Sequence, residues 1–116
     1  MPVVTVPEEI DITNADQLRA ALLQAAARPG PALAVDMTRT RFCDSAGLHA
    51  LIGAHKRARA EGRQVRLAVT GAQVRRLITL TALDRLIPGY PRLDQALAHR
   101  QAVPRPWPAK LSPDDP

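Results

Sequence analysis

The sequence of 116 residues has few aromatic side chains and almost no cysteine. Aromatic residues make up 3% of the chain, so the platforms on which nucleic-acid bases stack are missing. A single cysteine, Cys43, excludes an internal disulfide framework and favours a reducing compartment. No apolar run approaches the roughly 20 residues of a membrane-spanning helix, and the N-terminus lacks a signal-like basic and apolar region. We therefore expect a cytoplasmic protein without a membrane partner.

Composition otherwise indicates one ordinary soluble domain. The hydrophobic fraction of 46% and the charged fraction of 23% are typical of globular proteins, and this length can bury a core without disulfides or metal. The formal net charge is +5, but the arginines are scattered along the chain and do not form one basic tract. Solvated helix faces explain such a charge, so we expect no direct nucleic-acid partner.

Strand-like runs alternate with stretches in which apolar residues recur at helical spacing. Alternation of this kind predicts an α/β fold with right-handed crossovers, and ligands of such sheets bind at the carboxyl ends of the strands. The predicted order is a strand at 3–6, a helix capped by Thr13 or Asn14 and ended by Pro29, a strand at 32–35, a helix at 46–59, a strand at 65–69, a helix at 72–80, a brief strand near 86–87 and a last short helix at 93–98. The segment 101–116 contains five prolines and is predicted to be a disordered tail.

The segment Cys43-Asp44-Ser45-Ala46-Gly47 is close to the nucleophile elbow of serine hydrolases, and Ser45, Asp84 and His99 occur in the chain order of that class. However, Cys43 replaces the first glycine of the elbow, and the preceding strand ends several residues before the serine. The chain is also too short for a hydrolase sheet with a substrate pocket. We therefore expect no enzymatic activity.

Ser45 has two compatible interpretations. A serine before an apolar-periodic run commonly caps a helix, its oxygen accepting from a free backbone N–H. The same position favours anions, because the first-turn N–H groups and the helix dipole attract negative charge. The fold would tolerate a phosphate there. Asp44 is either a second cap, a solvated acid, or a group that orients the serine hydroxyl.

Metal and receiver-type sites are not indicated. His49 and His55 are six residues apart and so lie on different faces of the predicted helix, which excludes a shared metal. Asp36 at a strand end could be a phosphoacceptor, as in response-regulator receivers. That site needs a lysine after the last full strand, whereas Lys56 lies within a helix and Lys110 in the tail. We expect no cofactor.

Several segments, in order from about residue 3 to residue 98, together carry a resemblance to a known family. These segments are Glu9-Ile10-Asp11 with Asn14-Ala15 and Leu18, Val35-Asp36-Met37, Phe42-Cys43-Asp44-Ser45-Ala46-Gly47-Leu48, Gly62, Val74-Arg75-Arg76-Leu77 and Leu80-Thr81-Ala82-Leu83. They resemble those of the STAS domain family, and within it the bacterial anti-sigma factor antagonists. The resemblance implies a single STAS domain at 1–100, with a mixed, mostly parallel sheet and about four helices.

By this resemblance Ser45 is the residue that an anti-sigma factor with serine-kinase activity phosphorylates, with Asp44 and Asp11 as flanking acids. The unphosphorylated protein would bind the anti-sigma factor and release the sigma factor for transcription, and phosphorylation would reverse this until a phosphatase acts. The resemblance implies a partner-binding surface made of Asn14, Arg41, Ala46, Gly47 and Leu48. The alternative is an interaction module without phosphorylation, such as a stress-complex scaffold or a lipid-transport partner.

The sequence departs from the family pattern at three places. Ala46 stands where many members carry a second hydroxyl, which leaves Ser45 as the phosphorylatable residue of the motif. Ala82 replaces a glycine, a change that should not break the fold. Members usually have one more strand before Val3, for which this sequence has no room. Either the start of the sequence is placed too late, or this is a truncated member with an uncovered edge. If the strand is missing, the strand at 3–6 has an open edge, and we expect weak homodimerisation or pairing to a partner strand there.

Overall fold

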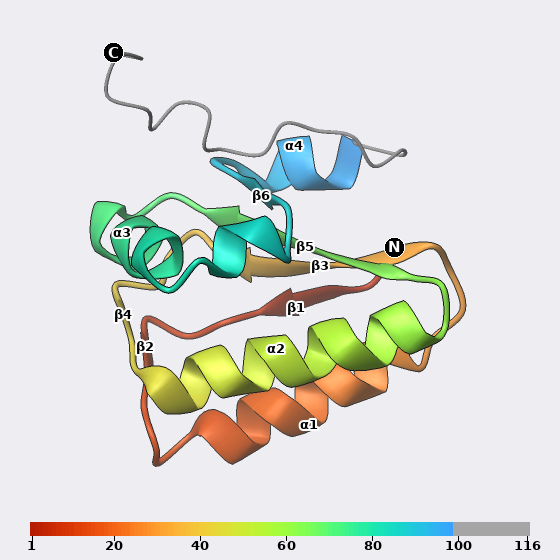
Figure 1. Ribbon diagram of the computed structural model, residues 1–116, viewed down its shortest axis with the longest axis horizontal. Helices are drawn as coiled ribbons and strands as arrows, with labels where there is room; N and C mark the ends of the chain where they lie inside the picture. Colours follow the sequence, from red (N-terminus) through yellow and green to blue (C-terminus); the bar gives the residue numbers. More distant parts are fainter. Residues whose placement is uncertain (99–116) are drawn as a thin grey trace.

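The computed structural model describes residues 1–98. The tail predicted at 101–116, the domain boundary at residue 100, and His99 lie outside the described residues. Strands and helices alternate as the sequence pattern predicted (Figure 1). The elements are β1 (Val3–Thr5), β2 (Glu9–Ile10), α1 (Ala15–Ala26), β3 (Ala32–Met37), β4 (Phe42–Cys43), α2 (Ser45–Ala60), β5 (Gln64–Val69), α3 (Ala72–Leu80), the 3₁₀ turn η1 (Leu83–Arg85), β6 (Gly89–Tyr90) and α4 (Leu93–Ala98).

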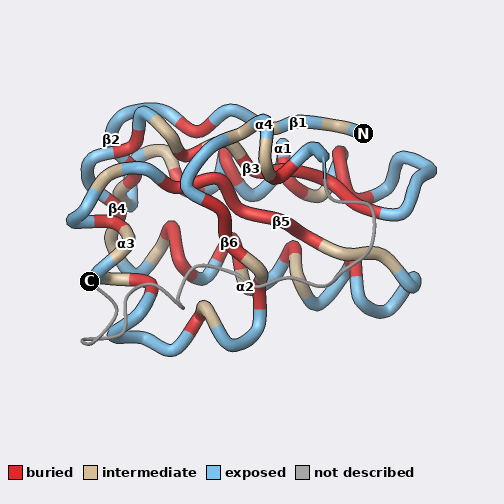
Figure 2. Tube along the Cα trace, turned by 90° about the horizontal axis from the view of Figure 1, so that it is seen from above, coloured by how far each residue is buried: buried red, intermediate tan, exposed pale blue. Residues whose placement is uncertain are grey.

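The main sheet has the strand order β1-β3-β5-β6, and every described pairing in it is parallel. Helices α1 and α2 lie on one side of this sheet and α4 on the other (Figure 1). The central strands β3 and β5 are therefore covered on both faces, and both are buried along most of their length (Figure 2). This double burial explains why the sequence of β3 reads as a nearly continuous apolar run.

Both faces of β5 are buried, although its sequence pattern alone does not indicate this. Arg66 and Ala68 alternate with valine and leucine, which is typical of a strand with one less buried face, yet Arg66 is only 2% exposed. Helix α4 covers that face, and the Arg66 guanidinium donates to the carbonyl of Ala96 at 3.1 Å and to Gln64 Oε1 at 2.8 Å. Burial lowers the pKa of Arg66. A small second cluster of Ala68, Tyr90 and Ala96 fills the same layer.

The strand predicted near Leu86-Ile87 was placed too early in the sequence. The observed strand is β6, Gly89–Tyr90, which follows Pro88. Ile87 is fully buried in the main core, which explains its apolar character without a strand. Upstream, Ala82 adopts a left-handed conformation with φ of 62°, the backbone shape that the family's glycine would adopt freely.

Strand β1 has an open edge within residues 1–98. Its inner side pairs with β3, since Ala34 N donates to the Pro2 carbonyl and Val6 N donates to the Asp36 carbonyl, both at 2.9 Å. The backbone groups of Val3 and Thr5 consequently point away from β3, where no described strand pairs with them. The expected uncovered edge is present in the described part, and self-association there stays a prediction. No helix among residues 1–98 is long and apolar enough to cross a membrane.

Candidate functional site

The site is built by a second, very short sheet at the carboxyl ends of β1 and β3. In it β2 pairs in parallel with β4, with Glu9 opposite Phe42 and Ile10 opposite Cys43. The pairing continues into Asp44, whose N–H donates to the Ile10 carbonyl at 3.1 Å. One step further along both strands come Asp11 and Asp44. Strands β2 and β4 lie side by side next to the start of α2 (Figure 1). Their pairing therefore brings these two acids, which are far apart in sequence, to the same edge of the fold.

Asp44, and not Ser45, caps helix α2. Its carboxylate Oδ1 accepts from the backbone N–H of Ala46 at 2.9 Å and from that of Gly47 at 3.3 Å. Ser45 is the first residue of the helix and is exposed. Within residues 1–98 its hydroxyl has no hydrogen-bond partner. The interpretation of Ser45 as the cap is therefore wrong, because the helix begins at Ser45 itself, one residue earlier than that role requires.

The loop after β2 holds the second acid in place. The Asp11 carboxylate accepts from the backbone N–H of Thr13 at 2.9 Å and from the Thr13 hydroxyl. The hydrogen bond from the Thr13 hydroxyl lowers the pKa of Asp11 most, and the one from the Thr13 N–H lowers it further. The lowered pKa keeps the side chain ionised. Asp11 therefore contributes a fixed negative charge to this edge.

Asn14 precedes α1, but its side chain does not cap that helix. Its Oδ1 accepts from the Asp11 N–H and its Nδ2 donates to the Glu9 carbonyl, both at 2.9 Å. The capping interaction expected from Thr13 or Asn14 is thus replaced by a link back to β2. Asn14 is half-buried and fixes the shape of the loop that carries Asp11.

Gly47 and Leu48 do not belong to an exposed surface. Both are buried, and a Cβ on Gly47 would lie 2.5 Å from Ile10 Cγ2 and 2.6 Å from Cys43 Sγ. The glycine therefore allows α2 to approach β2 and β4 closely. Cys43 lies in the same interior, where burial, with a smaller contribution from Asp44, raises its pKa to about 11. Gly47 and Leu48 therefore pack beneath the expected partner surface and are not exposed on it.

Two exposed apolar side chains flank the site and escaped the sequence reasoning. Ile12 is 79% exposed and Phe42 is 51% exposed. Phe42 precedes buried Cys43 in β4 and points outward by strand alternation, but a strand of two residues gives no such signal in the sequence. Arg41 is exposed beside them, and its guanidinium contacts the carboxylates of Glu8 at 3.6 Å and Glu9 at 3.8 Å.

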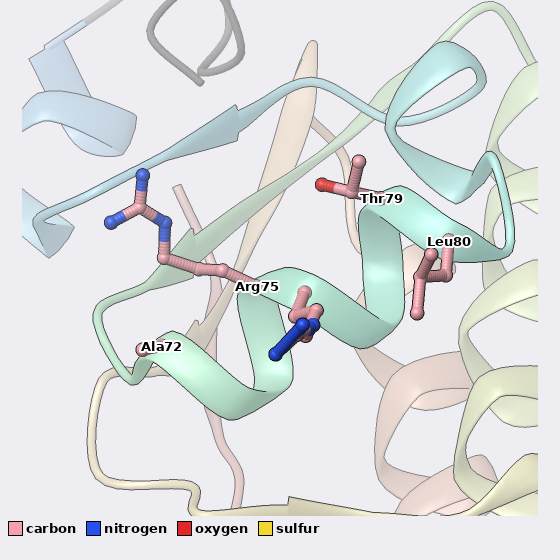
Figure 3. Close-up of a pocket in the computed structure, with 5 residues that line it drawn as sticks. Ala72, Arg75, Thr79 and Leu80 are labelled. Carbon is pink, nitrogen blue, oxygen red and sulfur yellow. The ribbon is translucent and has the colours of Figure 1, made fainter. Parts of the chain in front are cut away.

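The remaining candidate residues lie elsewhere or have structural tasks. The Asp36 carboxylate accepts from the N–H and the hydroxyl of Thr38 and so shapes the turn after β3. His49 and His55 are separate positions on α2, and no group of three His, Cys, Asp or Glu residues suited to a metal exists in residues 1–98. A hollow of about 300 Å³ lies on α3, but Figure 3 shows Arg75 and Leu80 extending in different directions from it.

Comparison with known proteins then gives the family. A sequence model of the STAS domain matches residues 1–96. The chain belongs to the STAS domain family. A Mycobacterium tuberculosis protein that carries the name anti-anti-sigma factor is 35% identical over 99 residues, which are 83% of this chain. This STAS domain spans 66% of that relative's length.

Solved structures agree with the observed architecture. The crystal structure of an anti-sigma factor antagonist from Mycobacterium paratuberculosis is 37% identical, with a TM-score of 0.74 over 82% of this chain and 80% of that one. A sulfate transporter family protein from Wolinella succinogenes has a TM-score of 0.73 over 84% and 81% of the two chains, at 17% identity. The predicted STAS fold, mostly parallel with four helices, is confirmed. The second comparison concerns the fold alone.

Proposed function

We propose that this STAS domain is an anti-sigma factor antagonist controlled by phosphorylation of Ser45. The unphosphorylated domain binds an anti-sigma factor that is also a serine kinase, and the sigma factor is thereby released. Phosphorylation of Ser45 weakens the complex, and a phosphatase restores it. The names of the two mycobacterial relatives, at 35% and 37% identity, support the class of partner. The proposal includes a cytoplasmic location and no catalysis by the domain itself.

The observation that carries the proposal is that Asp44, and not the exposed Ser45, caps helix α2. Asp44 satisfies the first-turn N–H groups of α2, so the exposed Ser45 hydroxyl has no structural task among the described residues. A kinase requires an accessible hydroxyl, and modification here removes no hydrogen bond from the fold. Phosphorylation would therefore change the surface of the domain and leave its interior intact.

The charges around Ser45 explain why the phosphate acts on the partner. A phosphoserine adds about −1.5 to −2 charges at neutral pH. The α2 N-terminus offsets part of this, by about 0.3–1 kcal/mol, while the carboxylates of Asp11 and Asp44 oppose it. The neighbouring cation, Arg41, is held by Glu8 and Glu9. Among residues 1–98 the phosphate thus lacks a neighbouring cation that is free of other carboxylates, and it stays exposed.

The surface that we assign to the partner differs from the expected one. It keeps Ser45, Ala46 and Arg41 and adds the exposed side chains of Ile12 and Phe42. Apolar groups around one hydroxyl suit a partner surface that excludes water, and a dianion in their midst would have to be desolvated. Asn14, Gly47 and Leu48 support this surface from beneath.

Phosphosite mapping tests the proposal. The protein is incubated with ATP and a candidate anti-sigma factor with serine-kinase activity, and the modified residue is located by mass spectrometry. We expect phosphate on Ser45, its loss in Ser45→Ala, and its retention in Ser112→Ala, which removes the other serine of the chain. Phosphate at Ser112 or at a threonine, with Ser45 unmodified, would contradict the switch and favour the interaction module without phosphorylation.

A further inference from the structure

The solvent face of α2 extends well beyond Ser45. Side chains three, four or seven residues apart share one face of a helix. Exposed or half-buried residues follow this spacing from Ser45 toward the C-terminal end of the helix, while the opposite face packs on the core. The residues of this solvent face are Ser45, His49, Ile52, Lys56, Arg59 and Ala60.

The C-terminal half of this face is hollowed. The hollow has a volume of about 420 Å³, within the range of ligand pockets. Five residues of α2 line it, and the segment after η1 closes it with Leu86. We call it the α2 pocket, lined by Ile52, His55, Lys56, Arg59, Ala60 and Leu86.

The α2 pocket carries positive charge that the domain does not neutralise. Lys56 and Arg59 are exposed and form no ion pair within residues 1–98, whereas nearby Arg57 pairs with Glu61 at 2.9 Å. No acidic residue lines the pocket. His55 is half-buried in the same wall, and burial together with Arg59 lowers its pKa. The complementary ligand is therefore an anion.

Apolar groups form the rest of the pocket. Ile52 is half-buried and packs against the main core. Leu86 is 49% exposed although it lies beside this concave surface. An exposed leucine in a hollow rimmed by cations suits a ligand that carries an apolar side chain as well as negative charge. The hollow on α3 offers a weaker case, because its side chains splay apart (Figure 3).

We propose that the α2 pocket binds an acidic peptide segment of a partner protein. One large apolar side chain of that segment inserts between Ile52 and Leu86, and its carboxylates contact Lys56 and Arg59. Ser45 and Arg59 are about 20 Å apart along the helix axis. This distance exceeds the Debye length of about 8 Å at physiological salt. The α2 pocket is thus a second binding site, which does not depend on the proposed switch.

Titration of the full-length protein tests this site. The probe is a short fluorescent peptide of glutamates and leucines, with the leucines at helical spacing, and binding is followed by anisotropy and by amide chemical shifts. We expect shifts at Ile52, Lys56 and Arg59. Lys56→Glu and Leu86→Ser should each weaken binding by roughly fivefold or more. Arg28→Glu reverses an exposed charge on another helix end and should change affinity less than about twofold.

Several results would overturn the proposal. These are the absence of shifts in α2, an equal loss in Arg28→Glu, and undiminished binding of a peptide whose leucines are replaced by serine. Equally tight binding of a short oligothymidine at the same residues would show that phosphates fit the pocket, and the assignment to an acidic peptide would fail. The assay contains no kinase and no anti-sigma factor, so its outcome is separate from that of the phosphosite mapping.

Discussion

Two substitutions of Asp44 distinguish the stabilisation that comes from its capping hydrogen bonds from the stabilisation that comes from its charge. Asp44→Ala removes an acceptor from two N–H groups, of which the one at 2.9 Å is well formed and the one at 3.3 Å is long. Loss of such a cap costs about 1 kcal/mol. Loss of the negative charge at the helix N-terminus adds about 0.5 kcal/mol. We expect the free energy of unfolding to fall by about 1.5 kcal/mol.

Asp44→Asn is the matched variant, because its amide oxygen can still accept from the first-turn N–H groups. It should cost only about 0.5 kcal/mol, the charge contribution. In thermal unfolding of a domain of this size the two variants should lower Tm by about 6 °C and 2 °C. Urea unfolding monitored by circular dichroism measures both free energies. Ser45→Ala serves as a control and should change stability by less than about 0.5 kcal/mol.

Equal losses in the alanine and asparagine variants would show that charge, and not capping, makes Asp44 stabilising. A destabilised Ser45→Ala beside an unaffected Asp44→Ala would return the cap to Ser45. Either result would refute the reasoning that leaves the serine hydroxyl free for modification.

Two further substitutions and one labelling reaction test the packing. Gly47→Ala should destabilise the domain by about 1–3 kcal/mol in urea unfolding, because its Cβ would overlap Ile10 and Cys43; an unchanged midpoint would mean that α2 lies further from β2. Ala82→Gly should raise the free energy of unfolding by about 0.5–1 kcal/mol, because glycine relieves the left-handed backbone; a loss of stability would contradict that conformation. With its pKa raised to about 11, Cys43 stays a protonated thiol at pH 8, so iodoacetamide should label it far more slowly in the folded protein than in urea, and equal rates would mean an accessible thiolate.

The sequence was sufficient for the elements that local patterns determine. Apolar residues at helical spacing predicted α1 to α3, and a continuous apolar run predicted the doubly covered strand β3. The predicted sheet edge also contains Ser45 and both acids. These features depend on residues close in sequence or on general rules of α/β topology.

Other features depend on contacts that local sequence does not encode. The two-residue strands β2 and β4 exist only through their mutual pairing, so neither shows a strand pattern by itself. The identity of the α2 cap depends on a one-residue choice of helix start. Gly47 and Leu48 belong to the family motif, but their burial follows from the approach of α2 to Ile10, which no local pattern specifies.

The most direct test of the proposed switch is the affinity for the anti-sigma factor before and after phosphorylation of Ser45. A misplaced dianion within an interface costs about 2–5 kcal/mol, which corresponds to a roughly 30- to 5,000-fold higher Kd. Isothermal titration of the two forms, with Ser45→Ala as the form that cannot be switched, measures this ratio. We predict tight binding by the unphosphorylated protein and by Ser45→Ala, and loss of binding on phosphorylation with little change in Tm. Equal affinity of the phosphorylated and unphosphorylated forms would contradict the switch.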